Sequence, residues 1–295
     1  MAHLKSKLLE IDIEPGAVSE VSPLLRRVTA PNPSVMTGPG TNAYIVGRKE
    51  LAIIDPGPSI SSHVSAMLEG CSGARLRWII VTHTHPDHSP AAMLLAEATG
   101  AELVGAMIEN DGHQDTSFQA DRQLQDGDVF ANDEFTLRAV HTPGHVGNHY
   151  CFFLEEEKTL FTGDHIMQGT TVVVIPPSGD MADYLHSLEK LKTLNAEYLA
   201  PAHGHVMLDA DSVIQGLIDH RLAREAKVVS AFEKCSSGTL DQLLPLVYDD
   251  VDPKVLPVAK IALWSHLLKL ETDGRASKQA GATIEQEIWS LTGSA

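Results

Sequence analysis

The chain has 295 residues, enough to bury one large core and a smaller second one. Its 39 acidic residues outnumber its 22 basic ones and give a formal net charge of −17, which disfavours non-specific binding to the phosphate backbone of nucleic acids. Three cysteines show no metal-ligand spacing and no disulfide framework, which fits a reducing cytosol. Residues 1–16 lack the apolar stretch of a signal peptide, and no window is apolar enough to span a bilayer, so we expect a cytoplasmic protein without membrane contact.

Two short strands joined by a charged turn are predicted at residues 42–47 and 51–57. Asp55 lies at the end of the second strand, before a Pro-Gly breaker. This residue either forms the turn or supplies a carboxylate that orients a metal-binding histidine. A helical pattern at residues 63–68 leads to the next strand. The alternation of strand, helix and strand favours sheets covered by helices.

The next stretch, residues 78–90, is an apolar, β-branched run followed by a histidine-rich loop and then by a helix rich in Ala and Leu. His83 and His85 lie two residues apart, so in an extended chain their side chains point to the same face and can bind one metal ion. Asp87 and His88 lie where the chain turns into the helix, so they project differently and are free to bind a second ion. The spacing predicts two neighbouring metal sites.

A polar, irregular segment at residues 107–127 follows a predicted strand at residues 101–105. It contains His113, Asp115 and Asp121. Because loops are mostly polar in any case, we expect this segment to be solvated surface. The alternative is a loop that overhangs a functional site.

Three later strands each end in a turn that carries a further candidate ligand. The strand predicted at residues 135–140 leads to His145, which can complete the first metal site. A predicted hairpin at residues 150–162 leads to Asp164, and the two oxygens of one carboxylate can bridge two cations. A short later strand precedes His203, which can complete the second site.

This order of ligands, a His-x-His-x-Asp-His loop, a lone His, an Asp and a final His, resembles the metallo-β-lactamase-fold hydrolases. The resemblance covers roughly residues 15–215 and implies an α+β fold, a four-layer αβ/βα sandwich with the metals at one edge of two packed sheets. It also implies two zinc ions, with manganese or iron as alternatives. By motif match, the first ion is bound by His83, His85 and His145, the second by Asp87, His88 and His203, and Asp164 lies between them.

Two zinc ions about 3.5–4 Å apart lower the pKa of a shared water, so the expected nucleophile is a metal-bridging hydroxide. Asp87 is expected both to bind metal and to orient this hydroxide, which makes it a candidate catalytic residue. His149 and His165 adjoin the ligand motifs. Each either donates a proton or a hydrogen bond to the substrate or supports the ligands from behind.

Two short motifs, Gly-Thr-Thr-Val at residues 169–172 and Asp-Tyr-x-x-Ser-Leu at residues 183–188, resemble the lactamase-beta-like endoribonuclease branch. That resemblance implies hydrolysis of phosphodiesters in single-stranded RNA. The alternative is hydrolysis of a small-molecule substrate, namely an acyl thioester, a lactone or another small ester, which fits the acidity of the chain better. True β-lactamases of this superfamily usually lack the bridging aspartate, so β-lactamase activity is expected to be weak or absent. A non-catalytic metal-binding interaction protein is the alternative from another class.

The C-terminal part is expected to be helical. Asp180 precedes an amphipathic helix, a long helical run begins at Asp209, and two further helices follow Thr239 and Pro253, the last with Trp264 in its core stripe. This order resembles a winged-helix module. We therefore expect a metallo-β-lactamase-fold catalytic domain at residues 1–215 and a winged-helix-like domain at residues 216–295. Residues 221–295 carry 9 basic and 10 acidic side chains, which indicates packing or substrate gating instead of a strong nucleic-acid patch. A homodimer is compatible with the sequence, although no pattern specifies one.

Overall fold

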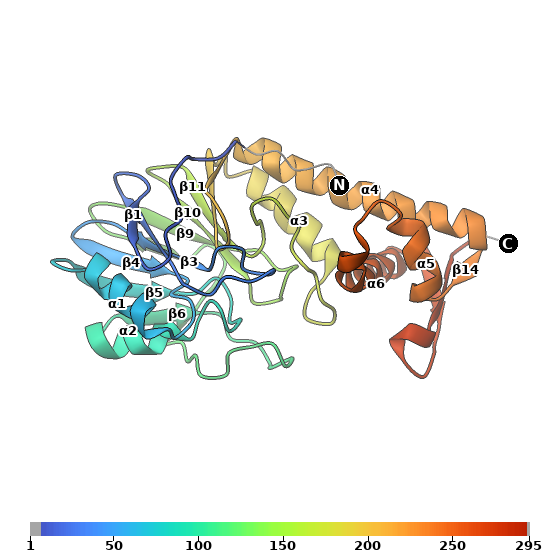
Figure 1. The fold of residues 1–295 in the computed structure, drawn as a ribbon, viewed down its shortest axis with the longest axis horizontal. Helices are drawn as coiled ribbons and strands as arrows, with labels where there is room; N and C mark the ends of the chain where they lie inside the picture. The colour runs from blue at the N-terminus through green and yellow to red at the C-terminus, as the bar shows by residue number, and fades with distance from the viewer. Residues whose placement is uncertain (1–6, 294–295) are drawn as a thin grey trace.

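The computed structural model describes residues 7–293 and contains two stacked β-sheets, helices on their outer faces and a smaller C-terminal module (Figure 1). The first six residues of the N-terminal stretch, in which we expect no signal peptide, lie outside the described residues. Within the described range, no helix has both the length and the apolar character needed to cross a membrane.

The first sheet has seven strands whose spatial order follows the sequence: β1 (Val18–Glu20), β2 (Leu25–Thr29), β3 (Asn42–Val46), β4 (Glu50–Ile54), β5 (Arg75–Ile80), β6 (Glu102–Gly105) and β7 (Arg122–Gln123). Neighbours from β1 to β4 are antiparallel, whereas β4 to β7 run parallel. Parallel neighbours need a crossover, and helices α1 (Ser61–Gly70) and α2 (Ala91–Thr99) supply the first two.

The second sheet has six strands in the order β13-β12-β11-β10-β9-β8. Its strands are β8 (Val129–Ala131), β9 (Thr136–His141), β10 (Tyr150–Leu154), β11 (Thr159–Gly163), β12 (Tyr198–Pro201) and β13 (Met207–Leu208). Only the β11 and β12 pair is parallel, and helix α3 (Met181–Lys192) lies between these two strands in the sequence.

The inner faces of the two sheets share one apolar core, in which Trp78 of β5 contacts Phe130 edge to face at a ring-centroid distance of 5.7 Å. On the outer faces, α1 and α2 pack on the first sheet, whereas α3 and α4 (Ala210–Cys235) pack on the second. Asp180 caps α3 as predicted, since its side chain accepts hydrogen bonds from two backbone N–H groups of the first turn. The predicted four-layer α+β sandwich is confirmed.

The C-terminal module has its own core, which is built from the second half of α4, from helices α5 (Leu240–Val247) and α6 (Leu256–Thr272), and from a three-stranded sheet. The strands are β14 (Ser237–Gly238), β15 (Ala276–Gln279) and β16 (Ile288–Leu291), and two single-turn 3₁₀ helices are η1 (Pro253–Val255) and η2 (Ile284–Gln286). Thr239 and Gln242 form a capping box at the start of α5, where the sequence predicts a helix.

The core of this module differs in detail from the predicted one. Trp264 is only half-buried, whereas Trp289 of β16 is fully buried at the centre together with Leu263 and Leu267 of α6. The last sandwich core residue on α4 is Ile218, and the first one of the module is Val228. A single helix therefore enters both cores, and the boundary predicted at residue 216 falls inside that helix (Figure 1).

Candidate metal centre

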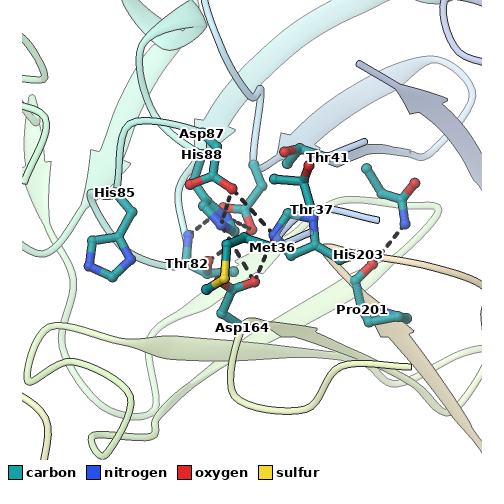
Figure 2. Close-up of polar contacts among 12 residues, drawn as sticks. Met36, Thr37, Thr41, Thr82, His85, Asp87, His88, Asp164, Pro201 and His203 are labelled. Atoms are coloured by element: carbon teal, nitrogen blue, oxygen red, sulfur yellow. Dashed lines mark hydrogen bonds and ion pairs between the residues drawn. The ribbon is translucent and has the colours of Figure 1, made fainter. Parts of the chain in front are cut away.

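The seven predicted ligands come from separate segments and meet at one edge of the stacked sheets. Figure 2 shows five of them, namely His85, Asp87, His88, Asp164 and His203. Each segment follows the end of a strand: β5 leads to the loop with residues 83–88, β9 to His145, β11 to Asp164 and β12 to His203. Two groups of donor atoms result, each with all atoms within 4.8 Å of one another. The side chains that the motif match assigns to two neighbouring metal sites thus lie side by side.

The first group consists of three histidines and one carboxylate. Nδ1 of His85 lies 2.8 Å from Nε2 of His83 and 3.1 Å from Nε2 of His145. Burial lowers the pKa of His85 to about 4, with help from His145 and His88. Burial likewise holds the pKa of His83 well below its usual range. Neutral imidazoles keep a lone pair available, so this group suits a divalent cation.

The second group consists of Asp87, His88 and His203. Oδ2 of Asp87 lies 3.5 Å from Nε2 of His88 and 3.3 Å from Nε2 of His203. Burial opposes protonation of His203, but Asp164 and Asp87 outweigh it and raise the pKa to about 9. The two carboxylates therefore stabilise positive charge at this position, and a divalent cation can supply that charge in place of a proton.

Asp164 lies between the two groups, as the sequence predicts for a bridging carboxylate. Its Oδ1 is 3.1 Å from Nε2 of His203 and 3.5 Å from Nε2 of His88, whereas its Oδ2 is 3.8 Å from Nε2 of His145. One oxygen thus faces each group. Oδ1 of Asp164 and Nε2 of His88 are buried, and their ion-pair contacts with the neighbouring side chains lack hydrogen-bond geometry, which fits atoms positioned to bind a metal ion.

Hydrogen bonds behind the ligands fix which ring nitrogen faces the centre. Nδ1 of His88 lies 3.0 Å from Oδ2 of Asp55, and Nδ1 of His145 lies 2.7 Å from the carbonyl oxygen of Val173. Asp55 also accepts hydrogen bonds from the backbone N–H and the hydroxyl of Thr82. Asp55 therefore contacts a candidate ligand, as expected if its carboxylate orients a metal-binding histidine.

Gly163 precedes Asp164 and has a left-handed backbone, with φ of 48°. A Cβ atom on this residue would lie 2.6 Å from both Nε2 of His149 and Oγ1 of Thr82. Glycine is required here, because any side chain would push against the residues that support the ligands.

The other two candidate catalytic residues, His149 and His165, are fully buried and do not line the cavity above the ligands. Nδ1 of His149 contacts the hydroxyl of Thr142 at 2.9 Å, and its Nε2 accepts a hydrogen bond from the Asp164 backbone N–H at 3.3 Å. The ring of His165 packs against the ring of Tyr184 at a centroid distance of 4.6 Å. These positions fit the supporting role that the sequence left open better than proton donation to a substrate.

A cavity of about 290 Å³ opens above the ligands. One wall is apolar, and Met36 lies over the ligand group (Figure 2). The lining residues are Met36, His85, Pro86, Asp87, Asp111, Gly112, His113, His145, Val146, Asp164, Met167, Val172, Val173, Ile175, Ser178 and His203.

The cavity corrects one prediction, because part of the polar segment 107–127 overhangs the site instead of forming only solvated surface. Asp111 and His113 line the cavity, and two neighbours are tied to the metal loop: Thr84 donates a hydrogen bond to Gln114, and Ser89 donates one to Asp115. Met36 also lines the cavity but could not be predicted, because its only signal in the sequence is a pair of apolar residues, Val35 and Met36, between Pro-rich and Gly-rich stretches.

Comparison with known proteins agrees with this geometry. The profile of the Metallo-beta-lactamase superfamily matches residues 36–203, more than half of the chain. The chain belongs to the metallo-beta-lactamase superfamily. It is a hydrolase of that superfamily, and the profile of the Beta-lactamase associated winged helix domain matches residues 239–289. The comparisons do not confirm the endoribonuclease branch.

Three similar proteins illustrate this relationship. The chain is 30% identical to an atrochrysone carboxyl ACP thioesterase of Cryptosporiopsis sp., over 94% of this chain and 88% of the relative. It is 36% identical to an atrochrysone carboxyl ACP thioesterase of Aspergillus fumigatus, over 73% of this chain and 67% of the relative. A beta-lactamase domain protein from Burkholderia ambifaria shares the fold with a TM-score of 0.78 at 20% identity, and the match covers 97% of both chains.

Proposed function

We propose that this metallo-beta-lactamase superfamily hydrolase cleaves acyl thioesters, or closely related small esters, at a centre with two divalent ions, zinc being the expected metal. The observation that carries the proposal is the composition of the cavity above the ligands. Its walls include Met36, Met167, Val172, Val173 and Ile175. An apolar wall beside a polar reacting centre suits an acyl group attached to a thioester carbonyl.

The same cavity gives little support to RNA as the substrate. None of its lining residues, all within residues 7–293, is Lys or Arg, and Asp111 adds a carboxylate near the opening. RNA-binding sites need cations for the phosphates and, for single strands, aromatic rings for the bases. The net charge of −17 works in the same direction. The thioesterase names of the two fungal relatives also favour thioester hydrolysis over hydrolysis of single-stranded RNA.

The donor set fits two divalent ions. His83, His85 and His145 would hold the first, Asp87, His88 and His203 the second, and Asp164 would contact both. When bound, such ions lower the pKa of water and polarise the carbonyl that is attacked. His203 faces Asp87 and Asp164, and His88 faces the same two carboxylates and Asp55, so the chain supplies negative charge that would offset part of the charge of two divalent ions.

The residues of the chain contribute orientation. Asp87 lines the cavity and is partly exposed, so its carboxylate can accept a hydrogen bond from the attacking water and direct the oxygen toward the thioester carbon. In the reaction the water oxygen forms a bond to the acyl carbon, the carbon–sulfur bond breaks, and the leaving sulfur takes up one proton. The products are a carboxylic acid and a thiol. Asp55, Thr82 and His149 hold the surrounding side chains in place from behind.

The test is a substrate panel with the zinc-loaded full chain: N-acetylcysteamine thioesters of acetate, hexanoate and decanoate, an unstructured RNA oligomer and a chromogenic β-lactam. We expect release of thiol from the thioesters, little or no β-lactam cleavage, and a loss of at least about 100-fold in the Asp87→Ala variant. The control is Asp121→Ala, which removes an exposed carboxylate from the loop between β6 and β7, outside the cavity.

Cleavage of RNA together with inertness toward every thioester would overturn the proposal. If the fully metal-loaded protein leaves the whole panel untouched, the non-catalytic metal-binding alternative gains. A homodimer stays a prediction, and light scattering of the same preparation tests it.

A further inference from the structure

A second cavity, of about 230 Å³, lies between the catalytic sandwich and the C-terminal module. The sandwich contributes residues 170–173 and the loop with Val35 and Met36, and the module contributes side chains of α4 and α6 and of the segment between α5 and α6. The lining residues are Val35, Met36, Met167, Thr170, Thr171, Val172, Val173, His220, Arg221, Arg224, Tyr248, Val251, Val255, Val258, Ala259 and Ala262.

This second cavity adjoins the one above the metal ligands. Four residues line both: Met36, Met167, Val172 and Val173. They form the apolar wall beside the ligands on one side and the floor of the interdomain cavity on the other. A molecule whose reacting group lies at Asp87 and Asp164 can therefore extend past Met36 into the interdomain cavity without leaving apolar surroundings.

Four of the five exposed residues that line the interdomain cavity are aliphatic, and the fifth is Thr170. Val35 is fully exposed, Met36 is 58% exposed, and Val255 and Val258 on the opposite side are 38% and 41% exposed. Exposed aliphatic residues that face each other across a cavity indicate a binding surface when they are this concentrated. The charged residues at its base make contacts of their own, since Arg224 pairs with Asp250 and Arg221 donates to the Val172 carbonyl.

We infer that the interdomain cavity binds the acyl chain of the thioester substrate, so that the winged-helix module is the acyl-specificity element of the enzyme. This inference rests on the proposed thioester hydrolysis. The thioester carbonyl lies at the metal ligands, and the chain passes Met36 and lies between Val35 of the sandwich and Val258 of α6. Medium-length and long acyl groups then gain by burial in the second cavity, whereas an acetyl group ends in the first.

The inference predicts a dependence on chain length. Each methylene buried in an apolar site raises kcat/KM by a factor of about four until the cavity is full. We therefore expect kcat/KM of the zinc-loaded chain to rise at least about 100-fold from the acetyl to the decanoyl thioester of N-acetylcysteamine. The thiol half is the same in both, so the ratio reports only on the acyl group.

Two variants test the location of the acyl group. Val258→Trp fills the cavity from the module side, and Val35→Asp places a charge on the sandwich side. Both positions are exposed, so the fold tolerates the changes. We expect each variant to lower the ratio of decanoyl to acetyl kcat/KM by about tenfold or more, mainly through KM. The matched control is Ile288→Trp. Ile288 lies in β16, outside the cavity, and is as exposed as Val258, so this variant should keep the ratio of the parent chain.

The outcomes separate this inference from the proposed function. If no thioester is cleaved, the proposed function fails. If all thioesters are cleaved with similar kcat/KM, or if both variants keep the parental ratio, the acyl chain lies elsewhere and only the inference fails. A fall of the ratio in Val258→Trp and Val35→Asp but not in Ile288→Trp supports it.

Discussion

Arg221 on α4 donates a hydrogen bond from Nη2 to the carbonyl oxygen of Val172 at 2.6 Å. The next carbonyl along the chain, that of Val173, contacts Nδ1 of the candidate ligand His145 at 2.7 Å. Two adjacent peptide units thus connect a helix shared by both domains to the metal centre. The same two valines form part of the wall between the two cavities. The C-terminal module and the reacting centre are therefore mechanically linked through residues 172 and 173.

Loss of the hydrogen bond between Arg221 and Val172 should lower both the stability and the activity of the protein. In an Arg221→Met variant the Val172 carbonyl, which is buried with its residue, loses a charged donor, and we expect the free energy of unfolding to fall by about 2 kcal/mol. We also expect kcat/KM to fall by about tenfold, because the segment that positions His145 loosens. Urea denaturation and thioester kinetics measure the two effects. Lys227→Met serves as control, since Lys227 lies on the same helix but makes only surface ion pairs, with Asp249 and Asp250, each worth at most about 1 kcal/mol. Equal behaviour of the two variants would refute the link.

Asp55 offers a test of the support behind the second group of ligands. Asn at this position keeps the shape but removes the charge that faces Nδ1 of His88. We expect Asp55→Asn to weaken binding of one of the two metal ions by about 10- to 100-fold, as is usual for carboxylates behind a metal-binding histidine. Elemental analysis after dialysis against a mild chelator should then find close to one ion per chain, against two in the parent. Asp121→Asn, whose carboxylate accepts a backbone hydrogen bond outside the cavity, should retain both ions.

Gly163 offers a test of strain beside Asp164. A Gly163→Ala variant must keep φ near 48° with a Cβ atom 2.6 Å from His149 and Thr82, so either the backbone or the supports of the metal centre must move. We expect a loss of about 2 kcal/mol or more in the free energy of unfolding, together with reduced metal content. Gly169→Ala is the matched control, because Gly169 has φ of 75° but no atom within 4 Å of the added carbon. In that variant the free energy of unfolding should fall only by the amount that a left-handed backbone costs a non-glycine residue, and the metal content should stay normal.

The sequence was most informative where chemistry and chain geometry coincide. Each candidate ligand follows the end of an apolar strand, and the resemblance to the metallo-β-lactamase-fold hydrolases implies that these strand ends lie at one edge of two packed sheets, so the ligand cluster could be predicted without coordinates. The overhang of Asp111 and the position of Met36 could not, because both depend on loops whose course is set by tertiary contacts such as that of Gln114 with Thr84. The helical pattern of the module predicts Trp264 as a core residue. In the structure Trp289 of β16 fills the centre of that core and Trp264 is only half-buried, because the position of β16 is not encoded in the local helical pattern.

Buried neutral histidines outside the metal centre predict the response of the fold to acid. His63 of α1 is fully buried with Nε2 at 3.0 Å from the Pro56 carbonyl oxygen, and burial lowers its pKa to about 4 from an ordinary value near 6.5. Between these two pH values the unfolded chain binds a proton that the folded chain does not. The contribution of His63 is therefore complete above pH 6.5 and is lost as the pH falls from 6.5 to 4, by about 3 kcal/mol in total.

The variant His63→Gln removes this titration. We expect its free energy of unfolding, measured by urea denaturation at a series of pH values in the presence of chelator, to fall less steeply between pH 6.5 and 4 than that of the parent chain. The metal-ligand histidines are the same in both proteins, so the difference between the two curves isolates His63. His186→Gln, at an exposed position of α3, should follow the parent curve. Parallel curves for the parent and His63→Gln would show that His63 takes up its proton equally in the folded and unfolded chain, contrary to the prediction.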